Sequence, residues 1–314
     1  MKTKPDFQFE KFLNIGFIQT VLDQELAWFS PSKNRWNVPM SPVAEHKMWQ
    51  EIKQGFVDLL TDHERANIII LPEVTLPLGY ENHIKKLCIE SNSVVIAGLD
   101  FDKTSKGIRN RALVIVPNRW PSQLKSTKTT TYYFGKTHFS QSEKDLFEDM
   151  GLKEYPDPTM YLFDADIYGK IGVAICSDFF DLERFIIYRG QIQTLIVIAH
   201  NKDTESYYFL TEAIARLVYC NVIICNTGHY GDSIAYSPYK EPFNRYIYRH
   251  RGQGLFATQV VKIPIESLIE SQRRYLSKTS YFKSPPPGYQ FKNFIHSRAI
   301  ERNIQEIPIA NPDQ

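Results

Sequence analysis

The chain has 314 residues, of which 43% are hydrophobic and 23% charged, the composition of a globular protein that can bury a full core. Its formal net charge is only +2, so we expect no overall electrostatic attraction to nucleic acid. No apolar run approaches the roughly 20 residues of a membrane helix, and the N-terminal residues lack the apolar stretch of a signal peptide.

Apolar segments rich in Ile and Val predict nine strands, which alternate with several helices and therefore predict α/β layers. The strands are expected near residues 13–19, 67–72, 93–99, 111–116, 129–135, 170–175, 194–199, 222–226 and 257–263. Apolar residues at helical spacing predict helices near 43–60, 84–88, 179–190 and 206–219, the last with Phe209, Ala213 and Leu217 four residues apart.

Two segments do not fit this alternation. Residues 21–41 have no regular pattern; they follow the first strand, and we expect them to form a loop that caps a pocket. Residues 268–314 contain Pro285-Pro286-Pro287-Gly288 and are predicted to be an extended C-terminal tail.

The four cysteines, at positions 88, 176, 220 and 225, form no CxxC pair and no zinc-ligand spacing, so no metal site is predicted. Without a secretion signal, we expect reduced thiols and a cytoplasmic location. Cys88, Cys220 and Cys225 lie inside apolar runs, as is typical of core cysteines.

Three predicted strands end on, or just before, a residue that can do chemistry: Glu73, Lys136 and Cys176. If these strands lie side by side and parallel, the three side chains meet in one crevice at the carboxyl edge. A helix start just after Cys176 would lower the pKa of the thiol, and the backbone N–H groups there could bind an oxyanion. Taken singly, each residue also fits a plainer role: a core cysteine, a surface glutamate or a solvated lysine.

The local sequences around these residues resemble the motifs of the nitrilase, or carbon–nitrogen hydrolase, superfamily. Members carry a Glu–Lys–Cys triad in this chain order. The matching segments are Leu71-Pro72-Glu73, Tyr133 to Lys136 with His138 and Glu143, and Gly172 to Asp178, and the resemblance spans roughly residues 13–267. Ser177, where the family commonly has a bulky residue, the segment 181–183 and the long 21–41 segment depart from the pattern.

This resemblance implies a four-layer αββα sandwich of the nitrilase type over residues 1–267, assembled as a homodimer or larger homo-oligomer. It also implies cleavage of a non-peptide C–N bond in a small amide, carbamoyl compound or nitrile, without metal or organic cofactor. Cys176 would attack to give a thioester-type intermediate, Glu73 would transfer the proton, and Lys136 with the Ser177 N–H would stabilise the oxyanion. An acyltransferase using the same triad remains an alternative.

Further residues are candidates for supporting the triad or contacting substrate. Glu143 matches the second glutamate of the family, and His138 is expected to be structural. His200-Asn201 follows the 194–199 strand and should reach the pocket rim. The full supporting set is Glu143, Ser177, Asp178, His200, Asn201 and Asn226.

The tail offers a different kind of function. Residues 271–300 contain six Lys or Arg, six Tyr or Phe and no acidic residue, a mixture that can bind single-stranded nucleic acid. An oligomer-contact arm is the preferred interpretation of this tail, with a nucleic-acid or protein partner in a larger complex as the alternative.

Overall fold

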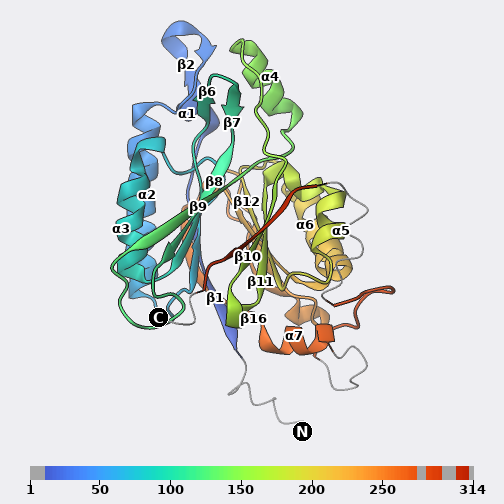
Figure 1. Ribbon diagram of the computed structural model, residues 1–314. Helices are drawn as coiled ribbons and strands as arrows, with labels where there is room; N and C mark the ends of the chain where they lie inside the picture. The colour runs from blue at the N-terminus through green and yellow to red at the C-terminus, as the bar shows by residue number, and fades with distance from the viewer. Residues whose placement is uncertain (1–10, 274–280, 292–301, 311–314) are drawn as a thin grey trace.

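Two β-sheets face each other, and each is covered by helices on its outer side (Figure 1). The computed structural model describes residues 11–273, 281–291 and 302–310. The first sheet has the order β16-β1-β4-β5-β8-β9, made of Ala257–Pro264, Phe12–Gln19, Ile68–Ile70, Val94–Gly98, Arg111–Pro117 and Thr129–Gly135. The second has the order β15-β14-β13-β12-β11-β10-β17, made of Tyr246–His250, Ser233–Tyr236, Asn221–Asn226, Thr194–Ala199, Lys170–Ile175, Met160–Asp164 and Ile304–Pro308.

Helices α2 (Pro42–Thr61) and α3 (Glu81–Ser91) cover the first sheet, and α5 (Leu182–Tyr188) and α6 (Thr204–Ile214) cover the second (Figure 1). The four-layer αββα prediction is thereby confirmed. Shorter helices are α1 (Gln24–Trp28), α4 (Gln141–Asp149), α7 (Glu266–Arg273), a π-helical turn η6 (Ala215–Tyr219) and the 3₁₀ turns η2 (Pro31–Lys33), η3 (Leu78–Tyr80), η4 (Asp166–Tyr168), η5 (Cys176–Phe180) and η7 (Pro242–Asn244). None of the helices in the described ranges is both long and apolar enough to span a membrane.

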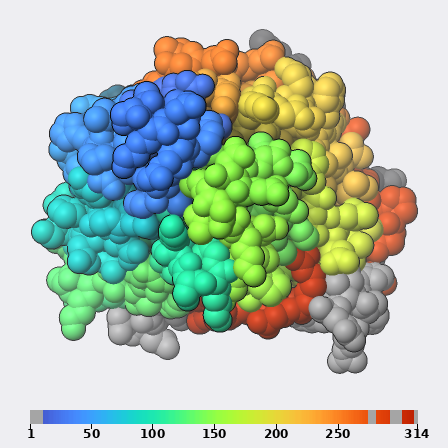
Figure 2. Space-filling view, turned by 90° about the horizontal axis from the view of Figure 1, so that it is seen from above, coloured from blue at the N-terminus to red at the C-terminus, as the bar shows by residue number. Residues whose placement is uncertain are grey.

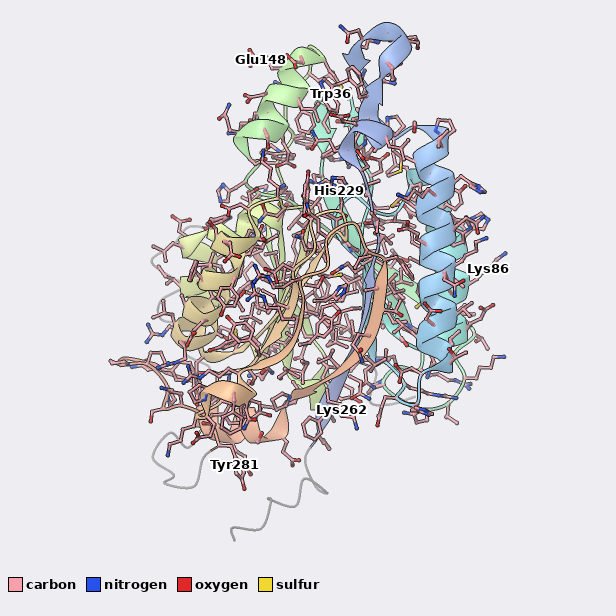
Figure 3. The ribbon with its side chains drawn as sticks, turned by 180° about the vertical axis from the view of Figure 1, so that it is seen from behind. Trp36, Lys86, Glu148, His229, Lys262 and Tyr281 are labelled. Carbon is pink, nitrogen blue, oxygen red and sulfur yellow. The ribbon has the colours of Figure 1, made fainter. Side chains whose placement is uncertain are left out.

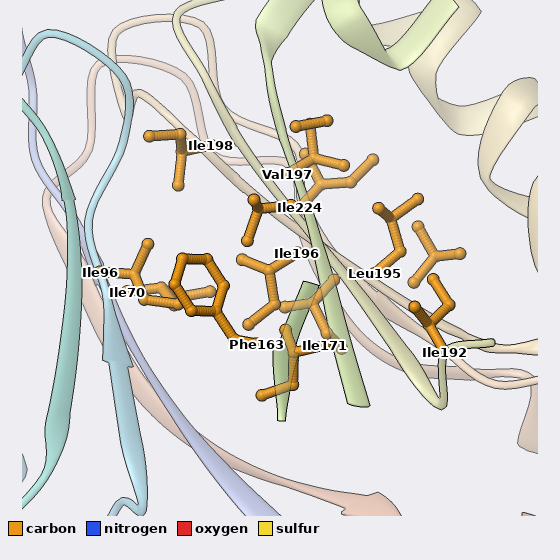
Figure 4. Packing of buried hydrophobic residues seen from close by; sticks show 14 of the residues in the cluster. Ile70, Ile96, Phe163, Ile171, Ile192, Leu195, Ile196, Val197, Ile198 and Ile224 are labelled. Atoms are coloured by element: carbon orange, nitrogen blue, oxygen red, sulfur yellow. The ribbon is translucent and has the colours of Figure 1, made fainter. Parts of the chain in front are cut away.

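The main core fills the space between the two sheets. Ile70 and Ile96 of the first sheet face Phe163, Ile171 and Ile196 of the second, and all five are almost completely buried (Figure 4). The apolar, Ile-rich character of the strands follows from this arrangement, because each sheet is covered on both faces. Cys88, Cys220 and Cys225 are fully buried, as predicted for core cysteines.

Helix α2 shows how the sequence specifies these layers. The Ser41 side chain accepts a hydrogen bond from the Ala44 N–H, and Pro42 occupies the first turn, where its missing N–H costs nothing. The apolar stripe then packs against the first sheet, and its buried members are Ala44, Met48, Ile52, Phe56 and Leu59.

All nine predicted strands are present, within two residues of their expected ends. The helix predicted over residues 206–219 is present as α6 and η6. Phe209, Ala213 and Leu217 lie on the exposed side, whereas Tyr207, Thr211 and Ile214 are buried. When a helix carries apolar residues on two sides, their spacing does not show which side is buried. Packing against the second sheet buries the side with Tyr207.

Residues 21–41 are also more regular than predicted. Asp23 caps the short helix α1, and β2 (Phe29–Ser30) pairs with β3 (Arg35–Trp36). A further hairpin joins β6 (Asp102–Thr104) to β7 (Gly107–Arg109). Seen from above, the blue 21–41 segment lies beside the green segment that contains α4 (Figure 2).

The described parts of 268–314 pack on the domain. Helix α7 buries Leu268, and β17 pairs in parallel with β10 at the edge of the second sheet. The boundary at residue 267 and the role as an oligomer arm stay predictions. Much of the basic and aromatic stretch, residues 274–280 and 292–301, lies outside the described residues.

Candidate active site

Glu73, Lys136 and Cys176 come together where strands of both sheets end. Glu73 follows β4 by three residues and Lys136 directly follows β9, both in the first sheet, whereas Cys176 directly follows β11 in the second. The expectation of one set of adjacent parallel strands is therefore wrong. The three residues meet because the two sheets are stacked with these strand ends at the same edge.

A buried ion-pair network connects the first two residues. The Lys136 Nζ lies 2.8 Å from the Glu73 Oε1 and 2.7 Å from both Glu143 oxygens. Burial disfavours the charge on Lys136, but the carboxylates of Glu143 and Glu73 outweigh it and raise the lysine pKa well above its usual value. Lys136 is thus a fixed cation, and Glu143 is placed by the Ser140 cap of α4.

Two further donors hold the Glu73 carboxylate. The Asn110 Nδ2 lies 2.7 Å from Oε1, and the His200 backbone N–H lies 2.9 Å from Oε2. Burial raises the pKa of Glu73, but the charge and hydrogen bond of Lys136, the electrostatic effect of His200 and the Asn110 hydrogen bond outweigh burial, so the net pKa is below the usual value. Asn110 also reaches Glu143 at 3.1 Å and was not predicted from the sequence.

Cys176 begins the 3₁₀ turn η5 with a positive φ of 47°. This left-handed conformation costs a non-glycine residue about 1–2 kcal/mol and often marks a functional position. Burial raises the pKa of the thiol, as does the negative charge of Glu73, so the resting group is a neutral thiol. The predicted thiolate at a helix N-terminus is therefore wrong, because α5 starts only at Leu182, capped by Asp181.

Ser177 and Asp178 join the cysteine turn to the lysine loop. The Ser177 hydroxyl donates to the His138 carbonyl oxygen, and Asp178 accepts hydrogen bonds from the Thr137 and His138 N–H groups. The buried Asp178 also pairs with Arg184 at 3.4 Å. The exposed His138 ring lies 3.4 Å from Asp181.

His200 and Asn201 lie on the loop after β12, and Asn226 is the last residue of β13. The His200 ring contacts the Leu22 carbonyl oxygen at 3.1 Å, which links this loop to the 21–41 segment. The Asn226 amide binds the Asn201 backbone N–H and carbonyl oxygen and the Gly231 carbonyl oxygen. Asn226 therefore fastens two loops together, and Asn201 reaches the pocket wall.

A pocket of about 550 Å³ opens over the cysteine. Its lining mixes charged, hydroxyl and aromatic side chains from α1, α4, α6 and the loops after β12 and β13. Figure 3 shows His229, one of the lining residues, between the sheets and the end that carries Trp36 and α4. Asp23, Gln24 and Glu25 of the 21–41 segment are among the lining residues, whereas Phe180 and Tyr207 are lining residues that the sequence did not indicate. Within the described residues, no three His, Cys, Asp or Glu side chains are grouped to hold a metal ion.

Comparison with solved structures finds the same fold in carbon–nitrogen hydrolases. A carbon–nitrogen hydrolase from Helicobacter pylori is 14% identical with a TM-score of 0.61, over 84% of this chain and 93% of that one. A CN-hydrolase superfamily protein from Xanthomonas campestris is 15% identical with a TM-score of 0.56, over 84% and 95%.

A third similar structure is an amidase from a Nesterenkonia species that carries the acetamide moiety of fluoroacetamide on its active-site cysteine. It is 11% identical with a TM-score of 0.57, over 84% of this chain and 95% of the amidase. No protein-family model matches the sequence, and no curated protein sequence matches it. The chain thus has the nitrilase-superfamily fold, and its chemistry rests on its own residues.

Proposed function

We propose that the protein hydrolyses a non-peptide C–N bond of a small amide, with Cys176 as the nucleophile. The observation that carries this proposal is the buried Lys136–Glu73 ion pair, 2.8 Å long, whose two charges both act on the Cys176 thiol. Burying two charges inside a protein costs free energy. A buried ion pair next to a strained cysteine that lines a pocket therefore favours a catalytic role for these residues.

In the first half of the reaction, Glu73 takes the proton from the thiol while Sγ bonds to the substrate carbonyl carbon. The carbonyl π electrons move to oxygen, where Lys136 and the Ser177 N–H stabilise the negative charge. When the C=O bond re-forms, the C–N bond breaks and the departing amine takes the proton from Glu73. A thioester on Cys176 remains.

In the second half, Glu73 takes a proton from water as the water attacks the thioester. When this second oxyanion collapses, the C–S bond breaks and the sulfur takes the proton from Glu73. The acid product then leaves. Lys136 lowers the pKa of Glu73 despite burial, so the Glu73 side chain is ionised. An ionised carboxylate can act as the base in both halves of the reaction. Glu143 keeps the lysine in place throughout.

We further propose that the protein acts as a homodimer through the outer face of α5, α6 and the adjoining turn η6. We call Leu182, Ile186, Phe209 and Leu217 the outer apolar face; they are 69%, 40%, 69% and 54% exposed. Apolar side chains gathered on one side of a chain commonly mark a contact with another protein.

The direct test of the hydrolase proposal is release of ammonia from a panel of small primary amides by the wild-type protein and by Cys176→Ser. Turnover by the wild type alone supports the proposal. Equal turnover by the serine variant would refute it, because an alcohol in this environment is a far weaker nucleophile.

A further inference from the structure

Tyr207 lies beside the nucleophile in the wall of the pocket. Its side chain is 3% exposed and comes from the first turn and a half of α6, on the buried face of that helix. Tyr207 and Cys176 line the same pocket, together with Ser177 and Phe180. The residue has no part in the reaction as described above.

The ring of Tyr207 is held on two sides. It packs edge-on against Phe179, with ring centroids 5.2 Å apart, and against Phe180 at 5.7 Å. Both phenylalanines belong to η5, the turn that Cys176 begins. The position of the phenol is therefore coupled to the position of the nucleophile.

The hydroxyl group is what distinguishes Tyr207 from a packing residue. Its oxygen is buried and makes no hydrogen bond of ordinary geometry to any described residue. A buried hydroxyl without a partner destabilises the resting protein, so a benefit in another state of the protein is expected. The hydroxyl faces the Cys176 thiol, where their interaction favours the thiolate.

We infer that Tyr207 is a catalytic residue that donates a hydrogen bond from its hydroxyl to the sulfur of Cys176 as the thiol loses its proton to Glu73. This inference deepens the proposed function and rests on the same nucleophile. The phenol keeps its own proton throughout. No bond forms or breaks at Tyr207, and the negative charge on sulfur is shared with its O–H until Sγ bonds to the substrate carbon.

The other charged groups around the sulfur make such a donor useful. Glu73 and Glu143 are negative and oppose the thiolate, whereas the positive charge of Lys136 favours it. Lys136 is already bonded to three carboxylate oxygens. An additional donor that is not engaged elsewhere therefore offsets part of the repulsion, because a hydrogen bond to a charged group is stronger than one between neutral groups.

The experiment follows alkylation of Cys176 by iodoacetamide across pH in the wild type, Tyr207→Phe and the control Tyr208→Phe. The other cysteines, 88, 220 and 225, are fully buried. Tyr208 lies on the same helix but stacks on Tyr246 instead. Tyr207→Phe should slow alkylation at neutral pH by about 10-fold or more and move the pH profile upward, whereas Tyr208→Phe should match the wild type.

An unchanged alkylation profile in Tyr207→Phe would overturn the inference. Ultraviolet absorbance of the thiolate, with Cys176→Ser as the blank, provides a second measurement of the same pKa, and thermal melting checks that the ring still packs. Alkylation needs no amide turnover, so its outcome is independent of the hydrolase proposal. Turnover by Cys176→Ser would refute the hydrolase without changing the result for Tyr207.

Discussion

The Trp28 indole nitrogen lies 2.9 Å from the Asp100 carboxylate and donates a hydrogen bond to it. The same carboxylate accepts a hydrogen bond from the Met40 N–H at 2.6 Å, so both sides of the β2–β3 hairpin are tied to Asp100, two residues after the end of β5. This anchor explains how an irregular segment holds Asp23 and Glu25 over the pocket.

Asp100→Asn should change the pH dependence of stability. Burial raises the pKa of Asp100 to about 6 from the model-peptide value of 3.8, despite its hydrogen bonds. Between these values the folded state binds the proton more tightly than the unfolded state, so this group stabilises folding at low pH and its contribution is lost as pH rises toward about 6. The free energy of unfolding of the wild type should therefore fall, relative to that of the variant, by up to about 1.4 kcal/mol per pH unit in this range.

Urea unfolding at a series of pH values measures this difference. Asp149→Asn, on the exposed side of α4, is the matched control and should follow the wild type. A constant free-energy difference between wild type and Asp100→Asn across the range would show that Asp100 does not titrate there.

Glu73→Gln should abolish most of the turnover while the protein stays folded. The amide keeps the size of the side chain but cannot accept the thiol proton, and general base catalysis contributes about 10²–10⁴-fold. Steady-state kcat is the measurement. Glu90→Gln, on the exposed surface of α3, is the control and should keep full activity; comparable kcat values for the two variants would remove Glu73 from the mechanism.

Asn110→Ala should lower kcat by about 10–100-fold, because a hydrogen bond to a charged group contributes about 1.5–3 kcal/mol. Asn110 lowers the pKa of Glu73, so the acid limb of the pH–kcat profile should also move to higher pH. Asn110→Asp keeps the shape but adds a third carboxylate to the network and should lose more activity than the alanine variant. A larger loss in Asn110→Ala than in Asn110→Asp would mean that packing, not hydrogen bonding, is the role of Asn110.

Leu182→Glu combined with Phe209→Glu should convert a dimer to a monomer. Two negative charges on the outer apolar face would have to be buried without partners in the interface. Sedimentation equilibrium of the double variant gives the mass, with Leu60→Glu on the opposite helix layer as the control. A wild-type protein that is monomeric at micromolar concentration would refute the proposed dimer.

The strand ends that carry the triad could be predicted because their signals are local. Ile68–Ile70 is a continuous apolar run, and Glu73 is the first ionisable residue after it. The same holds for Cys176 after β11. The stacking of two sheets, however, came from the family resemblance and not from the strand pattern, which is equally compatible with a single parallel sheet.

Asn110 and Tyr207 could not be found from the sequence for different reasons. Asn110 acts on Glu73, which is 37 residues away and lies beyond the intervening strand β5, so its neighbours in the chain do not indicate its role. Tyr207 was not singled out because the helix was predicted from the spacing of Phe209, Ala213 and Leu217, which lie on the exposed side. Only the packing of α6 on the second sheet decides between the two faces.

The most direct test of the central claim is intact mass spectrometry of the protein after exposure to a panel of small amides and nitriles, followed by peptide mapping. We expect an acyl adduct on Cys176 in the wild type, which for an amide substrate has the mass of that amide less its amine. We also expect no adduct and no turnover in Cys176→Ala. Turnover of any of these substrates by Cys176→Ala, or an acyl group mapped to a different residue, would contradict the central claim.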